Sequence, residues 1–189
     1  EELEMGVDTA LALQLLETRA LVSDKAAGVM LGRQGLRLKP RWRSITRRAL
    51  ARHGFATDIP SYEQKDGFAE KFLSDIGYPP MKSLDFSDYE GCDFTHDMNE
   101  PVPDTLRDRF DVILDGGTLE HVFNAPQALD NVFHMLKDDG IFISINGTLE
   151  VDLFGQCASE TMGSTYWSGS GGQADFARGA QYSEGGDGF

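Results

Sequence analysis

Apolar and polar positions follow a strand, loop, helix, strand order between residues 110 and 146. An apolar run at 112–114 ends at Asp115 and a Gly-Gly pair, and a second apolar run occupies 141–143. Between them, apolar residues recur at i, i+3, i+4 and i+7, namely at Leu129, Val132, Phe133 and Leu136. That spacing predicts a helix, which we expect Gly140 to end and Lys137 to favour near its C-terminus. The whole order predicts a βαβ unit in a parallel sheet.

Shorter apolar runs earlier in the chain predict the other strands of the same sheet. We expect strands near 28–31, 81–86, 92–96, 110–115 and 141–145. Residues 8–22, 40–54 and 67–76 have the composition and end signals of helices. The predicted fold class is therefore α/β, with a Rossmann-like parallel sheet of about five strands.

Acids and glycines follow several of the predicted strands. Gly32, Asp85, Asp97 and Asp115 each stand at or next to the end of a predicted strand. Because ligands sit at the carboxyl ends of parallel strands, we expect these four residues to cluster at one edge of the sheet.

Glu120 and His121 fall in the loop after the fourth predicted strand. They either take part in chemistry at this edge of the sheet or cap the helix that follows. One His and one Glu do not make a metal site, so no metal and no catalytic residue is assigned.

Charge and cysteine content narrow the classes of partner. The chain has 189 residues and a formal net charge of −14, which argues against generic nucleic-acid binding. No apolar run approaches the roughly 20 residues of a membrane span. Cys92 and Cys157 are far apart and have no metal-ligand spacing, which favours a reduced, cytoplasmic setting.

One stretch departs from this acidic balance. Eight cations and no acid occur between residues 33 and 52: Arg33, Arg37, Lys39, Arg41, Arg43, Arg47, Arg48 and Arg52. Apolar residues at 42, 45, 49 and 50 give the predicted helix a buried face, so the cations are either its solvated face or a site for an anionic partner.

The composition changes at Asn146. Residues 147–189 hold 10 of the 21 glycines, and Arg178 is their only basic residue. A sheet of this kind would continue with another helix and two strands, so we interpret 1–146 as an incomplete α/β domain and 147–189 as a glycine-rich extension.

A family resemblance rests on the sequence motifs FDVILDGG and LEHV and on the turn from Leu136 to Gly140. Over roughly residues 27–146 the chain resembles class I S-adenosylmethionine-dependent methyltransferases. The resemblance implies that Gly32 and Asp115 lie against the cofactor, that Asp85 binds its ribose, and that Asp97 with Met98 meets its adenine. Residues 30–35 lack the acid and one glycine of the family pattern, which predicts weak or absent binding of S-adenosylmethionine.

A second resemblance covers residues 146–189, through the words EVDLFGQ, SGSGGQADFARGA and SEGG. This stretch resembles the C-terminal domain of the acetyl-CoA hydrolase/CoA-transferase family. The resemblance implies that the loop 168–172 turns backbone amides toward a thioester carbonyl. The family's nucleophilic glutamate belongs to an upstream segment without a counterpart here, so we expect this fragment to be inactive alone and not to bind CoA.

The two resemblances describe a chimeric, transferase-like chain. The favoured hypothesis is a truncated methyltransferase-like domain with an unknown small-molecule substrate. One alternative is an acyl-CoA-metabolising CoA-transferase fragment, and another is a non-enzymatic interaction module that uses the basic helix 39–54. The methyl acceptor, the oligomeric state and the roles of Glu120 and His121 are not predictable from these patterns.

Overall fold

The computed structural model describes residues 6–145, 147, 150–153, 156–167, 169 and 173–182. The contacts within the chain divide it into two compact units, Glu1–Ile143 and Ser144–Phe189.

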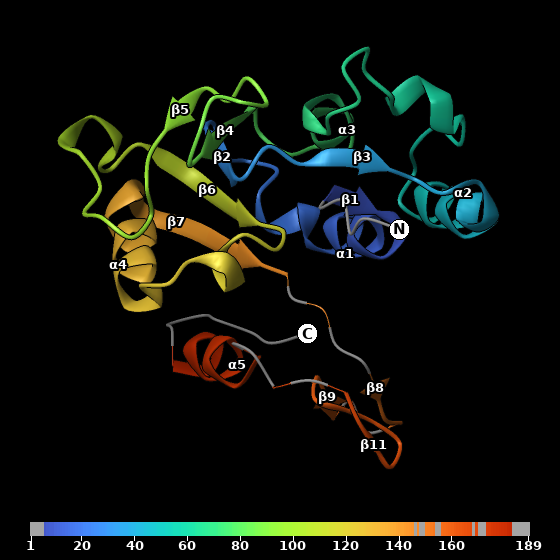
Figure 1. Ribbon diagram of the computed structural model, residues 1–189. Helices are drawn as coiled ribbons and strands as arrows, with labels where there is room; N and C mark the ends of the chain where they lie inside the picture. Colours follow the sequence, from blue (N-terminus) through green and yellow to red (C-terminus); the bar gives the residue numbers. More distant parts are fainter. Residues whose placement is uncertain are drawn as a thin grey trace. The chain divides into compact units, whose positions relative to one another are not determined.

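The first unit contains a five-stranded sheet (Figure 1). Its strands, in spatial order, are β5 (Phe94–Thr95), β4 (Met81–Asp85), β2 (Gly28–Leu31), β6 (Phe110–Asp115) and β7 (Leu136–Ser144). The pairings of β2 with β4 and β6, and of β4 with β5, are parallel. The predicted α/β class with five strands is confirmed.

The register places the carboxyl ends of the central strands at the same level. Leu31 of β2 pairs with Leu84 of β4 on one side and with Asp115 of β6 on the other. The loops that leave these three strands therefore start from one edge of the sheet.

A second, two-stranded sheet was not predicted from the sequence. It pairs β1 (Gly6–Asp8) in parallel with β3 (Gly35–Arg37). Strands of three residues carry little period-2 signal, which explains why the pattern did not reveal them. Asp8 then caps α1 (Thr9–Thr18), because its carboxylate accepts a hydrogen bond from the N–H of Leu11 at 2.9 Å.

Helices and short 3₁₀ turns fill the connections. The α-helices of this unit are α1, α2 (Arg43–Arg52), α3 (Glu70–Asp75) and α4 (Ala125–Met135). The 3₁₀ turns are η1 (Arg19–Leu21), η2 (Pro40–Trp42), η3 (Ile59–Tyr62), η4 (Asp104–Leu106) and η5 (Leu119–His121). The predicted helices 8–22, 40–54 and 67–76 are present but shorter, since 3₁₀ or irregular turns take their ends.

The last helix of the unit differs from its predicted face. Leu129 and Phe133 are 44% and 72% exposed, although both belong to the apolar period. Asn131 is buried instead, because its side chain bonds three backbone groups of the 98–102 loop. The helix ends at Met135, so Gly140 does not end it: Gly140 and Lys137 both lie in β7, where the ammonium group of Lys137 pairs with Asp111.

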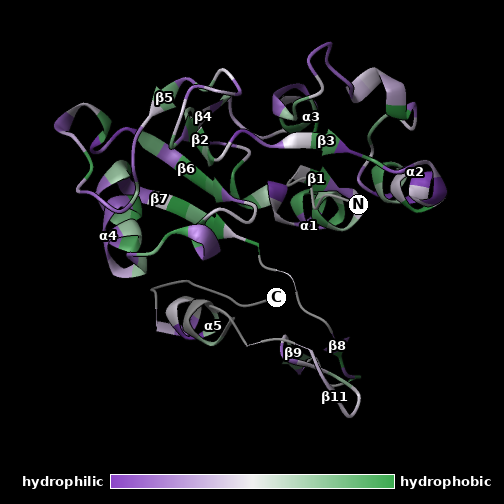
Figure 2. Ribbon diagram, in the orientation of Figure 1, coloured by the Kyte–Doolittle hydropathy of each residue, from purple (hydrophilic) through white to green (hydrophobic). Residues whose placement is uncertain are grey.

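The core of the first unit lies on both faces of the central strands. All four residues of β2 are buried, as are Val112, Ile113 and Leu114 of β6. Figure 2 shows hydrophobic residues along β6 and β7 and on the sides of the helices that meet the sheets. This uninterrupted apolar character is typical of parallel strands covered on both faces.

The described residues of the second unit form two short antiparallel pairs and a helix. β8 (Glu150–Val151) pairs with β9 (Cys157–Ala158), and β10 (Thr161–Met162) pairs with β11 (Thr165–Tyr166). The helix is α5 (Gln173–Tyr182). Across the described part of both units, none of the helices has the length and apolar character that crossing a membrane requires.

Candidate functional site

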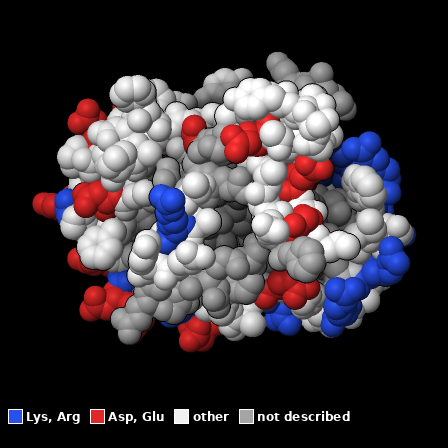
Figure 3. Space-filling view, turned by 90° about the horizontal axis from the view of Figure 1, so that it is seen from below, with Lys and Arg blue, Asp and Glu red and all other residues white. Residues whose placement is uncertain are grey.

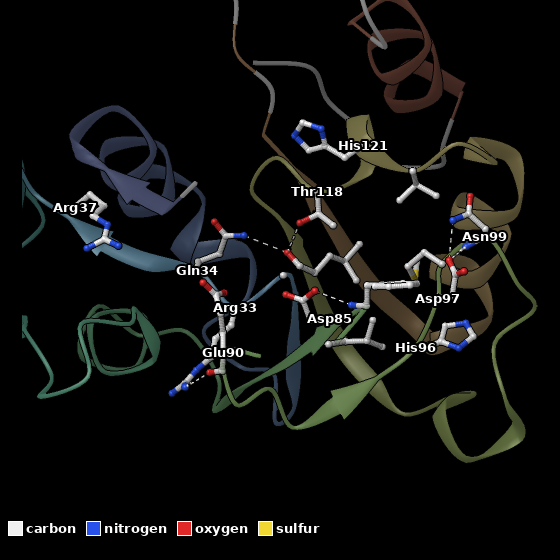
Figure 4. A pocket seen from close by; sticks show the side chains of 16 residues that line it. Arg33, Gln34, Arg37, Asp85, Glu90, His96, Asp97, Asn99, Thr118 and His121 are labelled. Atoms are coloured by element: carbon white, nitrogen blue, oxygen red, sulfur yellow. Dashed lines mark hydrogen bonds between the residues drawn. The ribbon is translucent and has the colours of Figure 1, made fainter. Parts of the chain in front are cut away.

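A pocket of about 510 Å³ opens at the carboxyl edge of the five-stranded sheet (Figure 4). Its wall is built by the loops that follow β2, β4, β5 and β6, with Arg37 added from β3 (Gly35–Arg37). The polar residues of the wall are Arg33, Gln34, Arg37, Asp85, Glu90, His96, Asp97, Asn99, Thr118 and His121. The apolar part comes from residues such as Leu31, Leu84 and Met98.

Four of the five predicted binding residues meet in this pocket. Gly32, Asp85, Asp97 and Met98 all line it, although they come from three different strand ends. Of the four residues expected to cluster at one edge, Gly32, Asp85 and Asp97 line this pocket, and Asp115 ends β6 at the same edge. Their contact with a ligand stays a prediction.

Asp115 is the fifth predicted residue, and it has a structural role. It is fully buried and does not line the pocket. One carboxylate oxygen accepts hydrogen bonds from the backbone N–H groups of Gly117, Thr118 and Leu119, at 3.3, 2.8 and 3.2 Å. Asp115 thereby fixes the loop that carries Thr118 and His121 into the pocket wall.

Gly32 stands where the chain turns between β2 and the pocket. Its φ is +71°, and its N–H donates to the carbonyl of Leu84 at 2.8 Å. A Cβ on Gly32 would lie 2.7 Å from the hydroxyl oxygen of Thr118. That hydroxyl donates to the carbonyl of Leu31 at 2.8 Å, so both sterics and backbone conformation favour glycine here.

Arg33 is itself part of the pocket wall and braces it through contacts that the sequence pattern did not reveal. Its guanidinium donates to Glu70 at 2.7 Å, to Asp66 at 2.8 Å and to the carbonyl of Glu90 at 2.7 Å. It also lies 3.9 Å from the ring centroid of Phe68. Partial burial works to lower the pKa of Arg33, but the hydrogen bonds and charges of Glu70 and Asp66 outweigh it and raise the pKa.

Two carboxylates face the pocket from neighbouring strand ends. One oxygen of Asp85 accepts from the N–H of Phe86 at 2.6 Å. Asp97 accepts from the N–H of Asn99 at 2.9 Å and from its side-chain amide at 2.7 Å, and these bonds lower the pKa of Asp97. The pair offers acceptors to ligand groups that donate hydrogen bonds.

The histidines of the wall have separate surroundings. His96 lies within 3.1 Å of the carbonyl of Glu100, and His121 ends the turn η5. Glu120 is exposed and does not line the pocket. In the described part of the chain, no three His, Cys, Asp or Glu residues are grouped as a metal site would require.

The comparisons with known proteins concern the other end of the chain. Residues 118–189 match the model of the acetyl-CoA hydrolase/transferase C-terminal domain. The chain is 60% identical over 53 residues to a succinyl-CoA:cyclohexane-1-carboxylate CoA transferase of Geobacter metallireducens. It is 47% identical over 58 residues to a 4-hydroxybutyrate coenzyme A transferase of Clostridium kluyveri. No solved structure matches the chain.

The aligned segments are short on both sides. They cover 28% and 31% of this chain, but only 12% and 13% of the two CoA transferases. A probable butyrate:acetyl-CoA coenzyme A-transferase of Syntrophomonas wolfei is 50% identical over 48 residues, 25% of this chain and 11% of that protein. The chain thus spans about an eighth of the length of these relatives.

The methyltransferase hypothesis is wrong on these findings, and so is the expectation of S-adenosylmethionine as a cofactor. The relatives found are CoA transferases, and none is a methyltransferase. The hypothesis failed because many α/β proteins share this pattern: a strand, a loop, a helix and a second strand, with acidic residues at the strand ends. The sequence motif around LEHV therefore indicates this α/β architecture and does not indicate a particular cofactor. The resemblance that is supported is the other one: residues 118–189 are similar to the C-terminal domain of acetyl-CoA hydrolases and transferases.

Proposed function

We propose that the chain serves acyl-CoA chemistry, with residues 118–189 contributing to the binding of a CoA thioester. The observation that carries this proposal is the 60% identity over 53 residues to a named CoA transferase, together with the match of residues 118–189 to the domain model. The other relatives quoted above are also CoA transferases by name. One short shared motif would not produce sequence identity over a segment of this length.

The order of the elements supports a binding role for the glycine-rich loop. The loop 168–172 follows the hairpin of β10 and β11 and precedes α5. Glycines permit a ligand to approach backbone amides closely, and such amides stabilise negative charge on a thioester oxygen. Of this loop, Gly169 is described, and a Cβ placed on it would meet nothing within 4 Å.

The hairpins before the loop are held by polar contacts within the same unit. The N–H of Gly163 donates to the carboxylate of Glu150 at 2.7 Å, and the N–H of Trp167 donates to the carbonyl of Glu160 at 2.8 Å. Gly163 has φ of +58°, which suits the turn between β10 and β11. These contacts hold the two hairpins together, and residues 168–172 follow the second hairpin along the chain.

Binding and turnover are separate parts of the proposal. A CoA transferase breaks the thioester bond of one acyl-CoA and forms one with a second carboxylate, which requires a nucleophile. The resemblance gives no nucleophilic glutamate to the matched stretch. We therefore propose that these 189 residues bind a CoA thioester, contrary to the expectation from the sequence, without exchanging its acyl group. In this proposal the glycine-rich extension binds the thioester, and the incomplete Rossmann-like sheet precedes it along the chain. We propose that the protein acts in a reduced, cytoplasmic setting.

Titration calorimetry of the full chain with acetyl-CoA tests the proposal. We expect a dissociation constant below about 1 mM. Gly169→Asp should weaken binding by about tenfold or more, because the added carboxylate repels the CoA phosphates and the thioester oxygen.

Gly147→Asp is the matched control, since a Cβ on Gly147 also meets nothing within 4 Å and this residue lies outside the loop. It should leave the affinity unchanged. Absence of binding at millimolar acetyl-CoA, or equal loss in both variants, would contradict the proposal. A thioester-exchange assay on the same protein examines turnover, and measurable exchange would contradict the second part.

A further inference from the structure

Exposed cations gather on α2 and on the turn before it. We define the basic patch by its five exposed members, which are Lys39, Arg41, Arg47, Arg48 and Arg52. No described carboxylate lies within ion-pairing distance of any of them. Figure 3 shows Lys and Arg side chains gathered on the side that α2 occupies. This local charge contrasts with a net charge of −14 for the chain.

The pattern is unfavourable for the helix itself. Arg43 with Arg47, and Arg48 with Arg52, place like charges four residues apart, where they repel each other. Arg43 also lies in the first turn, which has no acid, although the helix dipole disfavours cations there. A face that only needs solvation mixes both signs of charge. A single-signed face is favourable once an anion binds it.

The nature of the anionic partner follows from the other faces. Thr46, Ala49 and Leu50 are buried against the first unit, so α2 has no free apolar face to insert into a lipid surface. Four of the five patch members are arginines, whose planar guanidinium groups match the oxygens of a phosphate in pairs.

An aromatic side chain adjoins the patch. Trp42 is 42% exposed, and the guanidinium of Arg41 lies 5.4 Å from its ring centroid. Proteins that bind single strands combine a row of cations, which follows the phosphates, with aromatic rings on which bases stack. An acidic peptide would use the cations but would have no base to stack on Trp42.

We propose that the basic patch binds the phosphodiester backbone of single-stranded nucleic acid, with one base stacked on Trp42. The inference does not depend on acyl-CoA binding, because it uses only described residues of the first unit. The net charge predicts no affinity for nucleic acid over the surface as a whole, so binding is confined to this face.

Fluorescence anisotropy with a labelled oligo(dT) of roughly 12 nucleotides tests this proposal on the full chain. The affinity should fall as NaCl rises from about 50 to 200 mM, with a slope of about −0.7 in log K against log salt for each phosphate neutralised. Arg47→Gln with Arg48→Gln should reduce the slope by about 1.4, because two phosphates lose their cations. Glutamine has a good helix propensity, so α2 should persist.

A matched double variant removes the same charge elsewhere. Lys65→Gln with Arg107→Gln, both in the first unit and outside the patch, should leave slope and affinity unchanged. Trp42→Ala should weaken binding by about fivefold or more without changing the slope, because a stacked base carries no salt dependence. Absence of binding near 50 mM NaCl would overturn the proposal. So would an equal effect of the two double variants, or full competition by poly-glutamate at equal charge.

Discussion

The buried amide of Asn131 accepts a hydrogen bond from the backbone N–H of Val102, with 2.8 Å between nitrogen and oxygen. The same amide donates to the carbonyls of Met98 and Glu100, at 3.1 and 2.8 Å. Asn131 therefore ties α4 to the loop that follows β5. This loop carries Asp97, Met98 and Asn99 into the pocket wall, so the position of the wall depends on a helix that does not line it.

Asn131→Leu should destabilise the protein strongly. The variant keeps the volume but leaves the N–H of Val102 and the carbonyl of Met98 without partners, and each unpaired buried group costs about 1 to 3 kcal/mol. We expect a loss of about 2 to 4 kcal/mol in the free energy of unfolding, measured by urea titration. Asp130→Ala, on the exposed side of the same helix, should change it by no more than about 0.5 kcal/mol. Equal effects of the two changes would contradict this account.

Gly32→Ala tests the turn between β2 and the pocket. The φ of +71° alone should cost about 1 to 2 kcal/mol for a residue with a Cβ, and the contact with Thr118 adds to it. Gly54→Ala is the control, because its φ is +81° and a Cβ there meets nothing within 4 Å. Thermal melting should show a larger loss for Gly32→Ala. A loss no larger than that of Gly54→Ala would mean that the contact with Thr118 relaxes freely.

The sequence pattern located the sheet because its strands are bounded by glycine and acid. The predicted strands 28–31 and 110–115 agree with β2 and β6. The ends of these strands also predicted the edge of the sheet at which the pocket opens. The brace by Arg33 could not be predicted, since its partners Asp66 and Glu70 lie 33 and 37 residues away and no local spacing links them. The buried side of α4 was misjudged for the same reason: distant backbone groups, and not periodicity, decide that Asn131 faces inward.

The family assignment shows a second limit of pattern reading. Words that reflect architecture, such as the run ending at Asp115, occur wherever an α/β sheet does. The glycine-rich motif around Gly169 is specific to one family, and the comparisons support its resemblance to the acetyl-CoA hydrolase/transferase C-terminal domain. The more local and irregular a pattern is, the more it says about chemistry.

Asp111 should make the stability depend on pH in the acid range. Partial burial works to raise the pKa of Asp111, but hydrogen bonds from Lys137 and from the N–H of Ala27 outweigh it and lower the pKa below its usual 3.8. A lowered folded pKa gives stability that is present above the unfolded value and is lost as pH falls through the folded value.

Asp111→Asn should therefore be less stable than the native protein near pH 7, and the gap should narrow once the pH falls below about 3.8. Melting temperatures measured from neutral to acid pH, as far as the protein stays folded, check this. Asp88→Asn, which removes an exposed carboxylate, should show no such gap. A gap for Asp111→Asn that stays constant with pH would argue against the ion pair as its source.

Tyr78 should add a dependence on alkaline pH. Burial raises its pKa to about 12, although the hydrogen bond with the hydroxyl of Thr18, at 2.8 Å, works in the opposite direction. A raised folded pKa means that the stabilisation is complete below the unfolded value of about 10 and disappears as the pH rises through the folded value. The native protein should therefore lose stability between about pH 10 and 12 as the unfolded chain releases this proton.

Tyr78→Phe should lose about 0.5 to 1.5 kcal/mol near pH 7, because the bond to Thr18 is gone, and should lose less than the native protein between about pH 10 and 12. Urea titrations at several alkaline pH values measure both effects. Absorbance near 295 nm in the folded native protein should show ionisation of a tyrosine near pH 12 that is absent from Tyr78→Phe. Thr18→Val separates the two causes, since it removes the hydrogen bond but keeps the buried phenol, so its alkaline loss of stability should persist. Tyr78→Phe with an alkaline profile identical to that of the native protein would refute the assignment to Tyr78.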